Sequence, residues 1–104
     1  MDKRTINKAI NFLKEELISN GVNVNGIALF GSQMSGNATE ESDLDLIIIS
    51  DTFKRKDIFE RCKLTMNAEW NTIKKFKIPM DILTMTPKEY ETAINNKRYE
   101  ATII

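Results

Sequence analysis

The sequence contains no histidine and a single cysteine, Cys62, among its 104 residues. Without histidine, Ser-His-Asp triads, Cys-His dyads and zinc sites built with histidine are excluded. One cysteine cannot form a disulfide within the chain. Any catalysis must therefore use carboxylates, hydroxyls, amines or bound ions.

The chain also lacks net charge and long apolar runs. Fifteen Lys and Arg balance fifteen Asp and Glu, so neither a membrane partner nor direct nucleic-acid binding is expected. The longest apolar runs have four residues, as in Leu46–Ile49, whereas a membrane span needs about 20. The opening residues Met1–Arg4 do not form a signal-peptide pattern, and we expect a cytoplasmic protein.

Apolar residues at helical spacing predict three helices. The first ends at Asn20-Gly21, and the third begins at Thr86-Pro87 and ends near Asn95. The second extends from Lys56 to about Lys77, and we expect its apolar stripe to face the core. The first stripe consists of Ile6, Ile10, Leu13 and Leu17, and the second of Phe59, Cys62, Met66, Trp70 and Ile73.

Three short apolar segments are typical of strands: Ile27–Phe30, Leu44–Ile49 and Ile78–Met85. They alternate with the helices, and the tail to Ile104 stays ambiguous. The expected fold is α/β (α+β), a small mixed sheet of about three to four strands flanked by helices. We expect one domain over residues 1–104.

Two acidic residues open the second strand, in the segment Ser42-Asp43-Leu44-Asp45. On a strand, Asp43 and Asp45 share a face with Cα atoms roughly 6.6 Å apart, so both carboxylates can reach one cation such as Mg²⁺. Glu40 and Glu41 add charge that a cation would neutralise. The alternative is a strand that merely begins at a solvated end.

A glycine-serine turn precedes this strand. Gly31-Ser32 follows the first strand, and a tight turn there exposes N–H groups and a hydroxyl that can bind phosphate. Gly36 allows the chain to return. An ordinary turn is the alternative for these glycines, and the pattern is neither a P-loop nor a dinucleotide fingerprint.

A third carboxylate, Asp81, lies within the last predicted strand. An acid in an apolar strand is costly unless it meets a cation or a donor. If this strand lies beside the one that carries Asp43 and Asp45, three carboxylates converge and can hold two divalent cations. An exposed sheet edge is the alternative.

Together these residues resemble the minimal nucleotidyltransferases of the DNA polymerase beta-like superfamily. The shared pattern is Gly31-Ser32, ten intervening residues, Asp43-x-Asp45, and a third acid at Asp81. The resemblance implies that the three Asp residues are catalytic and bind two Mg²⁺ ions. It also implies that a nucleoside triphosphate, expected to be ATP, binds at Gly31, Ser32, Gly36 and Ser42.

The acceptor and partner are likewise implied by the resemblance. Minimal members are typically paired with an all-helical HEPN-type ribonuclease, which they adenylylate on tyrosine as antitoxins of a toxin–antitoxin system. Many carry arginines where this chain has Gln33 and Ser35. That departure leaves open a binding module that acts by occlusion alone. Transfer to a small molecule such as an aminoglycoside is a third possibility, and the chain could also form a homo-oligomer.

Overall fold

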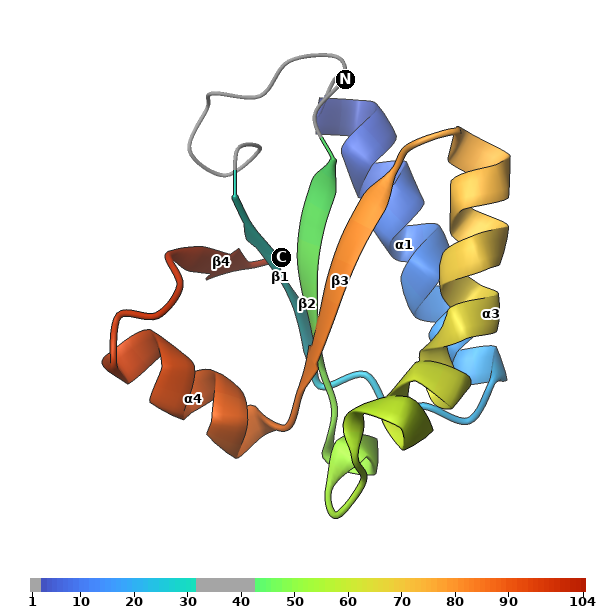
Figure 1. The fold of residues 1–104 in the computed structure, drawn as a ribbon. Helices are drawn as coiled ribbons and strands as arrows, with labels where there is room; N and C mark the ends of the chain where they lie inside the picture. The colour runs from blue at the N-terminus through green and yellow to red at the C-terminus, as the bar shows by residue number, and fades with distance from the viewer. Residues whose placement is uncertain (1–2, 32–42) are drawn as a thin grey trace.

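The computed structural model describes residues 3–31 and 43–104 and shows a four-stranded mixed sheet (Figure 1). The strand order is β3-β2-β1-β4, and the expected fold class is confirmed. The strands are β1 (Gly26–Phe30), β2 (Leu44–Ile49), β3 (Met80–Met85) and β4 (Ala101–Ile103).

The central strand β2 joins two kinds of pairing. It is antiparallel to β1 and parallel to β3. A parallel neighbour requires a crossover, which here consists of the short helix η1 (Asp51–Phe53) and the long helix α3 (Ile58–Phe76). The ambiguous tail forms β4, which pairs antiparallel with β1 at the opposite edge from β3.

Helix α1 (Lys3–Ser19) follows its sequence pattern. The predicted stripe Ile6, Ile10, Leu13 and Leu17 is buried, together with Ala9. The chain leaves the helix at Gly21, whose φ of 85° lies in the left-handed region that glycine adopts without strain. This helix therefore forms where apolar spacing and a glycine stop signal agree.

Helix α3 forms as expected, but the prediction of its core face is wrong. Phe59, Met66 and Trp70 are more than half exposed, and Cys62 is also exposed. The buried positions are Thr65, Ala68 and Thr72, on the other side of the helix. Leu64 and Phe76 of α3 also pack against the core, so the helix is turned with its Phe59–Trp70 stripe away from the core.

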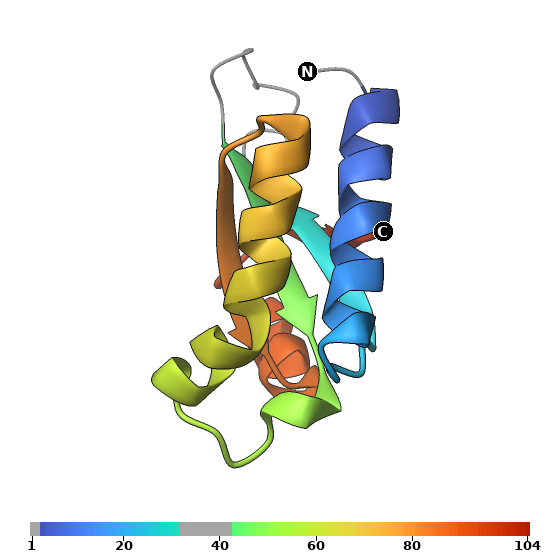
Figure 2. The same ribbon diagram turned by 90° about the vertical axis from the view of Figure 1, so that its right-hand side faces the viewer.

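The two long helices lie side by side on one face of the sheet (Figure 2). Phe12 of α1 and Phe76 of α3 meet edge to face at 5.8 Å between ring centroids. The Asn71 amide donates a hydrogen bond of 2.7 Å to the Glu16 carboxylate. The main core cluster lies between these helices and the sheet, and includes Leu44, Leu46 and Ile48 of β2, Phe53 of η1 and Ile78 before β3.

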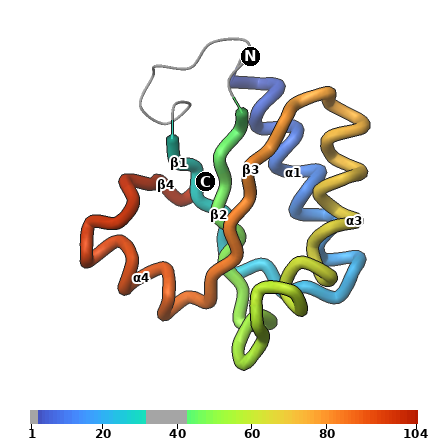
Figure 3. Tube along the Cα trace, viewed as in Figure 1, coloured from blue at the N-terminus to red at the C-terminus, as the bar shows by residue number. Residues whose placement is uncertain are grey.

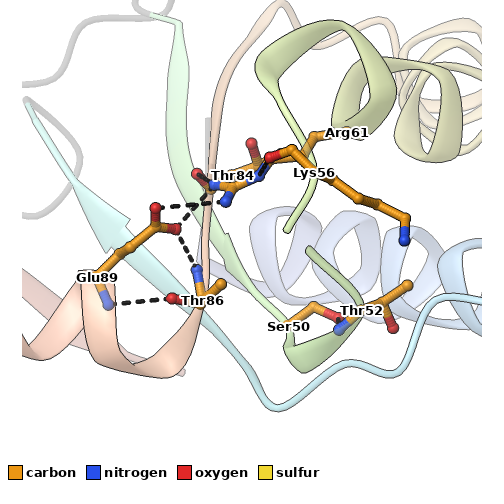
Figure 4. Close-up of polar contacts among 7 residues, drawn as sticks. All are labelled: Ser50, Thr52, Lys56, Arg61, Thr84, Thr86 and Glu89. Carbon is orange, nitrogen blue, oxygen red and sulfur yellow. Dashed lines mark hydrogen bonds and ion pairs between the residues drawn. The ribbon is translucent and has the colours of Figure 1, made fainter. Parts of the chain in front are cut away.

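Helix α4 (Pro87–Asn95) packs on the other side of the sheet, as the Cα trace shows (Figure 3). It begins as predicted, because Thr86 accepts a hydrogen bond from the Glu89 N–H while Glu89 accepts one from the Thr86 N–H. Arg61 of α3 reaches across to the Glu89 carboxylate at 2.8 Å and to the Thr84 carbonyl at 3.3 Å (Figure 4). This contact ties α3 to the junction of β3 and α4.

Within residues 3–31 and 43–104, every helix is too short or too polar to cross a membrane.

Candidate functional site

The parallel pairing of β2 and β3 brings two of the predicted carboxylates together. Asp45 and Asp81 are register partners, one strand apart. Asp43 lies exposed directly before β2. The start of β2, the start of β3 and the end of β1 lie at the same edge of the sheet (Figure 1). The strand that carries Asp81 therefore lies beside the strand that carries Asp45, which was the condition for a third carboxylate at the site.

Both carboxylates belong to the sheet face that α1 and α3 do not cover. Asp45 is the only residue of β2 that is not buried. Side chains alternate along a strand, so Asp45 shares a face with Ile47 and Ile49 rather than with the residues packed against the two long helices. By the same alternation Asp81 lies on the face of Leu83, and is exposed.

Gly31 makes room for the Asp45 carboxylate. The residue ends β1 with a φ of 74°, and an added Cβ would overlap a carboxylate oxygen of Asp45. Its Cβ would also lie 2.8 Å from the Asp45 Cγ atom, closer than real contacts allow. The backbone conformation therefore favours glycine, and any larger residue would displace the Asp45 side chain, which is a more specific role than the tight turn expected from the sequence.

Among the described residues, Asp45 has negatively charged neighbours and no ion-pair partner. Partial burial raises the pKa of Asp45, and the negative charges of Asp81 and Asp43 raise it further. Within residues 3–31 and 43–104, the ion pairs Lys54–Asp51 and Arg61–Glu89 both lie elsewhere. A divalent cation would relieve this repulsion.

The chemistry of these donors fits Mg²⁺, although the side chains do not form a closed ion site. Carboxylate oxygens are the protein ligands that Mg²⁺ prefers, usually with water and substrate phosphates completing its shell. Among residues 3–31 and 43–104, no three acidic or sulfur side chains are grouped tightly enough to hold a metal ion. Asp43, Asp45 and Asp81 would have to turn toward a shared ion when it binds together with a phosphate ligand.

An aromatic pair beside the carboxylates was missed by the sequence analysis. Phe30 is the register partner of Asp45 on β1, and its ring meets Tyr99 edge to face at 5.5 Å. Both rings contact the apolar cluster on the open face of the sheet. The position of Phe30 directly before Gly31-Ser32 was a usable signal, whereas nothing local in the sequence places Tyr99 there.

Two hollows occur away from the carboxylates. One, of about 350 Å³, lies between α3 and β3 and is lined by Ile58, Glu69 and Leu83 among others. The other, of about 460 Å³, surrounds the start of α4. Neither hollow is lined by Asp43, Asp45 or Asp81, so the volume of a hollow does not identify the predicted carboxylate site.

The remaining predicted nucleotide ligands, Ser32, Gly36 and Ser42, lie outside the described residues, as do Gln33 and Ser35. Of the predicted phosphate-binding turn, the structure places Gly31 alone. It stands at the end of β1, against Asp45 and therefore next to the carboxylates.

Comparisons with solved structures concern the fold. A candidate nucleotidyltransferase from Sulfolobus solfataricus shares the fold with a TM-score of 0.64 at 20% identity, covering 99% of this chain and 87% of that one. The BolA domain of SufE1 from Arabidopsis thaliana reaches 0.52 at 20% identity, over 86% of this chain and 98% of its own. At such identities the likeness concerns the fold alone.

The comparison with curated proteins found no match. A family model, described as the nucleotidyltransferase domain, matches residues 6–104. That match spans nearly the whole chain and includes the Gly-Ser turn and all three Asp residues. The chain therefore belongs to the nucleotidyltransferase-domain family, whose shared activity is nucleotidyl transfer.

Proposed function

We propose that this chain is a Mg²⁺-dependent nucleotidyltransferase that moves AMP from ATP onto a hydroxyl group of a partner protein. The observation that carries the proposal is the register of Asp45 with Asp81, directly against the Gly31 turn. Membership of the nucleotidyltransferase-domain family supports the reaction class. The repulsion of Asp45 by Asp81 and Asp43 supports a cation requirement.

In the proposed reaction, the three carboxylates have different roles. The acceptor oxygen forms a bond to the α-phosphorus, the bond from that phosphorus to the bridging oxygen breaks, and pyrophosphate leaves. Asp81 would receive the proton of the acceptor hydroxyl; its exposure, greater than that of Asp45, supports this role. Asp43 and Asp45, with Asp81, would hold two Mg²⁺ ions, which supply positive charge to the phosphate oxygens.

The turn after β1 would hold the β- and γ-phosphates of the triphosphate. Gly31 begins that turn with its backbone against Asp45, so phosphates bound there lie beside the carboxylates. Ser32, Gly36 and Ser42 are proposed to complete the phosphate contacts through N–H groups and hydroxyls. Displacing the Gly31 backbone would therefore weaken both metal binding and nucleotide binding.

The partner that we propose is an all-helical HEPN-type ribonuclease, which the chain would silence as a cytoplasmic antitoxin by modifying a tyrosine. Support comes from the likeness to minimal nucleotidyltransferases that occur in such pairs. The described helices and strands all belong to one sheet-and-helix core, and none of them forms an additional domain that could hold an acceptor.

The test follows the α-phosphate of ATP. Purified protein is incubated with Mg²⁺, an extract of cells that carry its gene, and ATP labelled on either the α- or the γ-phosphate. The proposal expects a protein band labelled from the α-phosphate alone, and no band with Asp45→Asn or Asp81→Asn. Glu91→Gln, which removes an exposed carboxylate from α4, is the matched control and should retain transfer. Label from the γ-phosphate, or transfer by Asp45→Asn, would contradict the proposal.

A non-catalytic antitoxin is the second candidate, because Gln33 and Ser35 replace arginines common in related minimal proteins. Loss of two cations beside a triphosphate weakens its binding. In that case Asp45→Asn would neutralise the partner as well as the wild type does. Restoring the cations with Gln33→Arg and Ser35→Arg would then raise ATP affinity, whereas a working enzyme gains little.

A further inference from the structure

Helix α3 presents an apolar stripe to solvent. Phe59 is 76% exposed, Trp70 60% and Met66 52%, and Cys62 and the half-buried Ile73 lie in line with them. At about 100° of rotation per residue, all five positions fall within an arc of about 80° on the helix surface. Cys62 borders the hollow between α3 and β3, whereas Phe59, Met66 and Trp70 do not line it. A contiguous apolar patch of this kind marks an interaction surface.

The stripe has the same spacing in both directions along the helix. Its five residues, from Phe59 to Ile73, are separated by three, four, four and three positions, with Met66 in the middle. In a two-fold symmetric antiparallel helix pair, residue i meets residue j while j meets i. Two copies of α3 centred on Met66 would bring together Met66 with Met66, Cys62 with Trp70, and Phe59 with Ile73.

Area and charge are compatible with a second copy as the occupant. Aromatic side chains bury about 150–250 Å² each, so the exposed parts of Phe59 (76%) and Trp70 (60%) supply about 200–340 Å². This is about a quarter to two-fifths of the roughly 800 Å² that each partner contributes to a standard interface. Ile58, 72% exposed, lies about 100° around the helix from Phe59 and belongs to the hollow between α3 and β3 rather than to the stripe. The chain carries no net charge, so two copies do not repel each other at neutral pH.

We propose that this stripe is the interface of a symmetric antiparallel homodimer centred on Met66. The inference does not rest on the proposed function, because α3 covers one face of the sheet and Asp45 lies on the other. Pairing through α3 therefore leaves the carboxylate edge of each copy open. A dimer of this kind presents two sites facing away from the shared helices.

Sedimentation equilibrium of the whole chain tests the dimer. The wild type is expected at twice its mass of 12.0 kDa at micromolar concentration, and Met66→Glu at 12.0 kDa with an unchanged circular dichroism spectrum. Met66 is half exposed, so the charge does not enter the core. A monomeric wild type overturns the proposal, and so does a dimer that survives Met66→Glu.

Cross-linking tests the centre of symmetry. In a Cys62→Ser background, Met66→Cys places the only cysteine on the proposed two-fold axis, where a short bismaleimide should join two copies in high yield. Glu91→Cys in the same background, exposed on α4, is the control and should stay monomeric on a denaturing gel. Equal yields from both positions would overturn the assigned register. Mg²⁺-dependent ATP binding measured in Met66→Glu separates this result from the proposed function, because the dimer hypothesis expects it unchanged.

Discussion

Replacing Gly31 with alanine should damage the fold and the site together, and Gly21 offers a matched comparison. Both glycines have positive φ, 74° at Gly31 and 85° at Gly21, so alanine meets the same backbone strain at either position. That strain is about 1–2 kcal/mol. The two positions differ in their surroundings, because an added Cβ overlaps the Asp45 carboxylate at Gly31 and meets nothing within 4 Å at Gly21.

The overlap at Gly31 forces the Asp45 side chain out of its position. An off-rotamer side chain costs about 0.5–1.5 kcal/mol. Gly31→Ala should therefore lower the free energy of unfolding by roughly 2–3 kcal/mol, about 1 kcal/mol more than Gly21→Ala. Urea denaturation with EDTA present measures both values.

The same pair of variants reports on metal binding. A ligand at about ten times its Kd stabilises the folded state by about 1.4 kcal/mol. The wild type and Gly21→Ala should gain stability when EDTA is replaced by Mg²⁺ and a nucleoside triphosphate, whereas Gly31→Ala should not. Equal destabilisation by both alanines, with the same gain from Mg²⁺, would refute the role assigned to the Gly31–Asp45 contact.

Three further predictions concern stability. Asp45→Asn should raise the free energy of unfolding by about 1 kcal/mol, measured by urea titration in EDTA. The reason is that Asp45 and Asp81 are register partners on strands about 5 Å apart, and two unit charges at that distance in water repel each other by about this amount. A loss of stability would contradict this prediction. The hydrogen bond from Arg61 lowers the pKa of Glu89 from 4.5, so this contact stabilises the fold above pH 4.5 and is lost as pH falls through the lowered pKa. Arg61→Ala should flatten that acid limb in pH-dependent melting. Lys77→Gly should raise stability by about 0.5–1 kcal/mol in thermal unfolding, because Lys77 ends α3 at a φ of 56°.

Local sequence signals predicted most of the secondary structure. The stripe of α1, its glycine stop and the Thr86-Pro87 start of α4 are all confirmed, because each depends on residues within one or two helical turns. The strand β4 was not predicted. It has three residues and forms only by pairing with β1, more than 70 positions away in the chain.

The face of α3 could not be predicted from periodicity. The helix has an apolar stripe and a separate small-residue side at Thr65, Ala68 and Thr72, and hydrophobicity alone selects the stripe. Close packing against α1 and the sheet selects the small side instead. An exposed stripe is therefore visible only once the neighbours of α3 are in place.

The residues of the candidate site could be named from the sequence, but their proximity in space could not be predicted from it. Asp43 and Asp45 are neighbours along the chain, whereas Asp81 reaches them only because β3 is parallel to β2 and in register with it. No local sequence feature establishes that pairing. The contact between Gly31 and Asp45 similarly depends on β1 pairing antiparallel with β2.

We propose that this edge of the sheet binds a nucleoside triphosphate through divalent cations. Calorimetric titration of ATP into the full chain, first with Mg²⁺ and then with EDTA, is the test. We expect binding with Mg²⁺, none with EDTA, and none for Asp45→Asn, while Glu91→Gln binds as the wild type does. Binding that persists in EDTA or in Asp45→Asn, or no binding of millimolar ATP with Mg²⁺, would contradict the assignment of the three carboxylates.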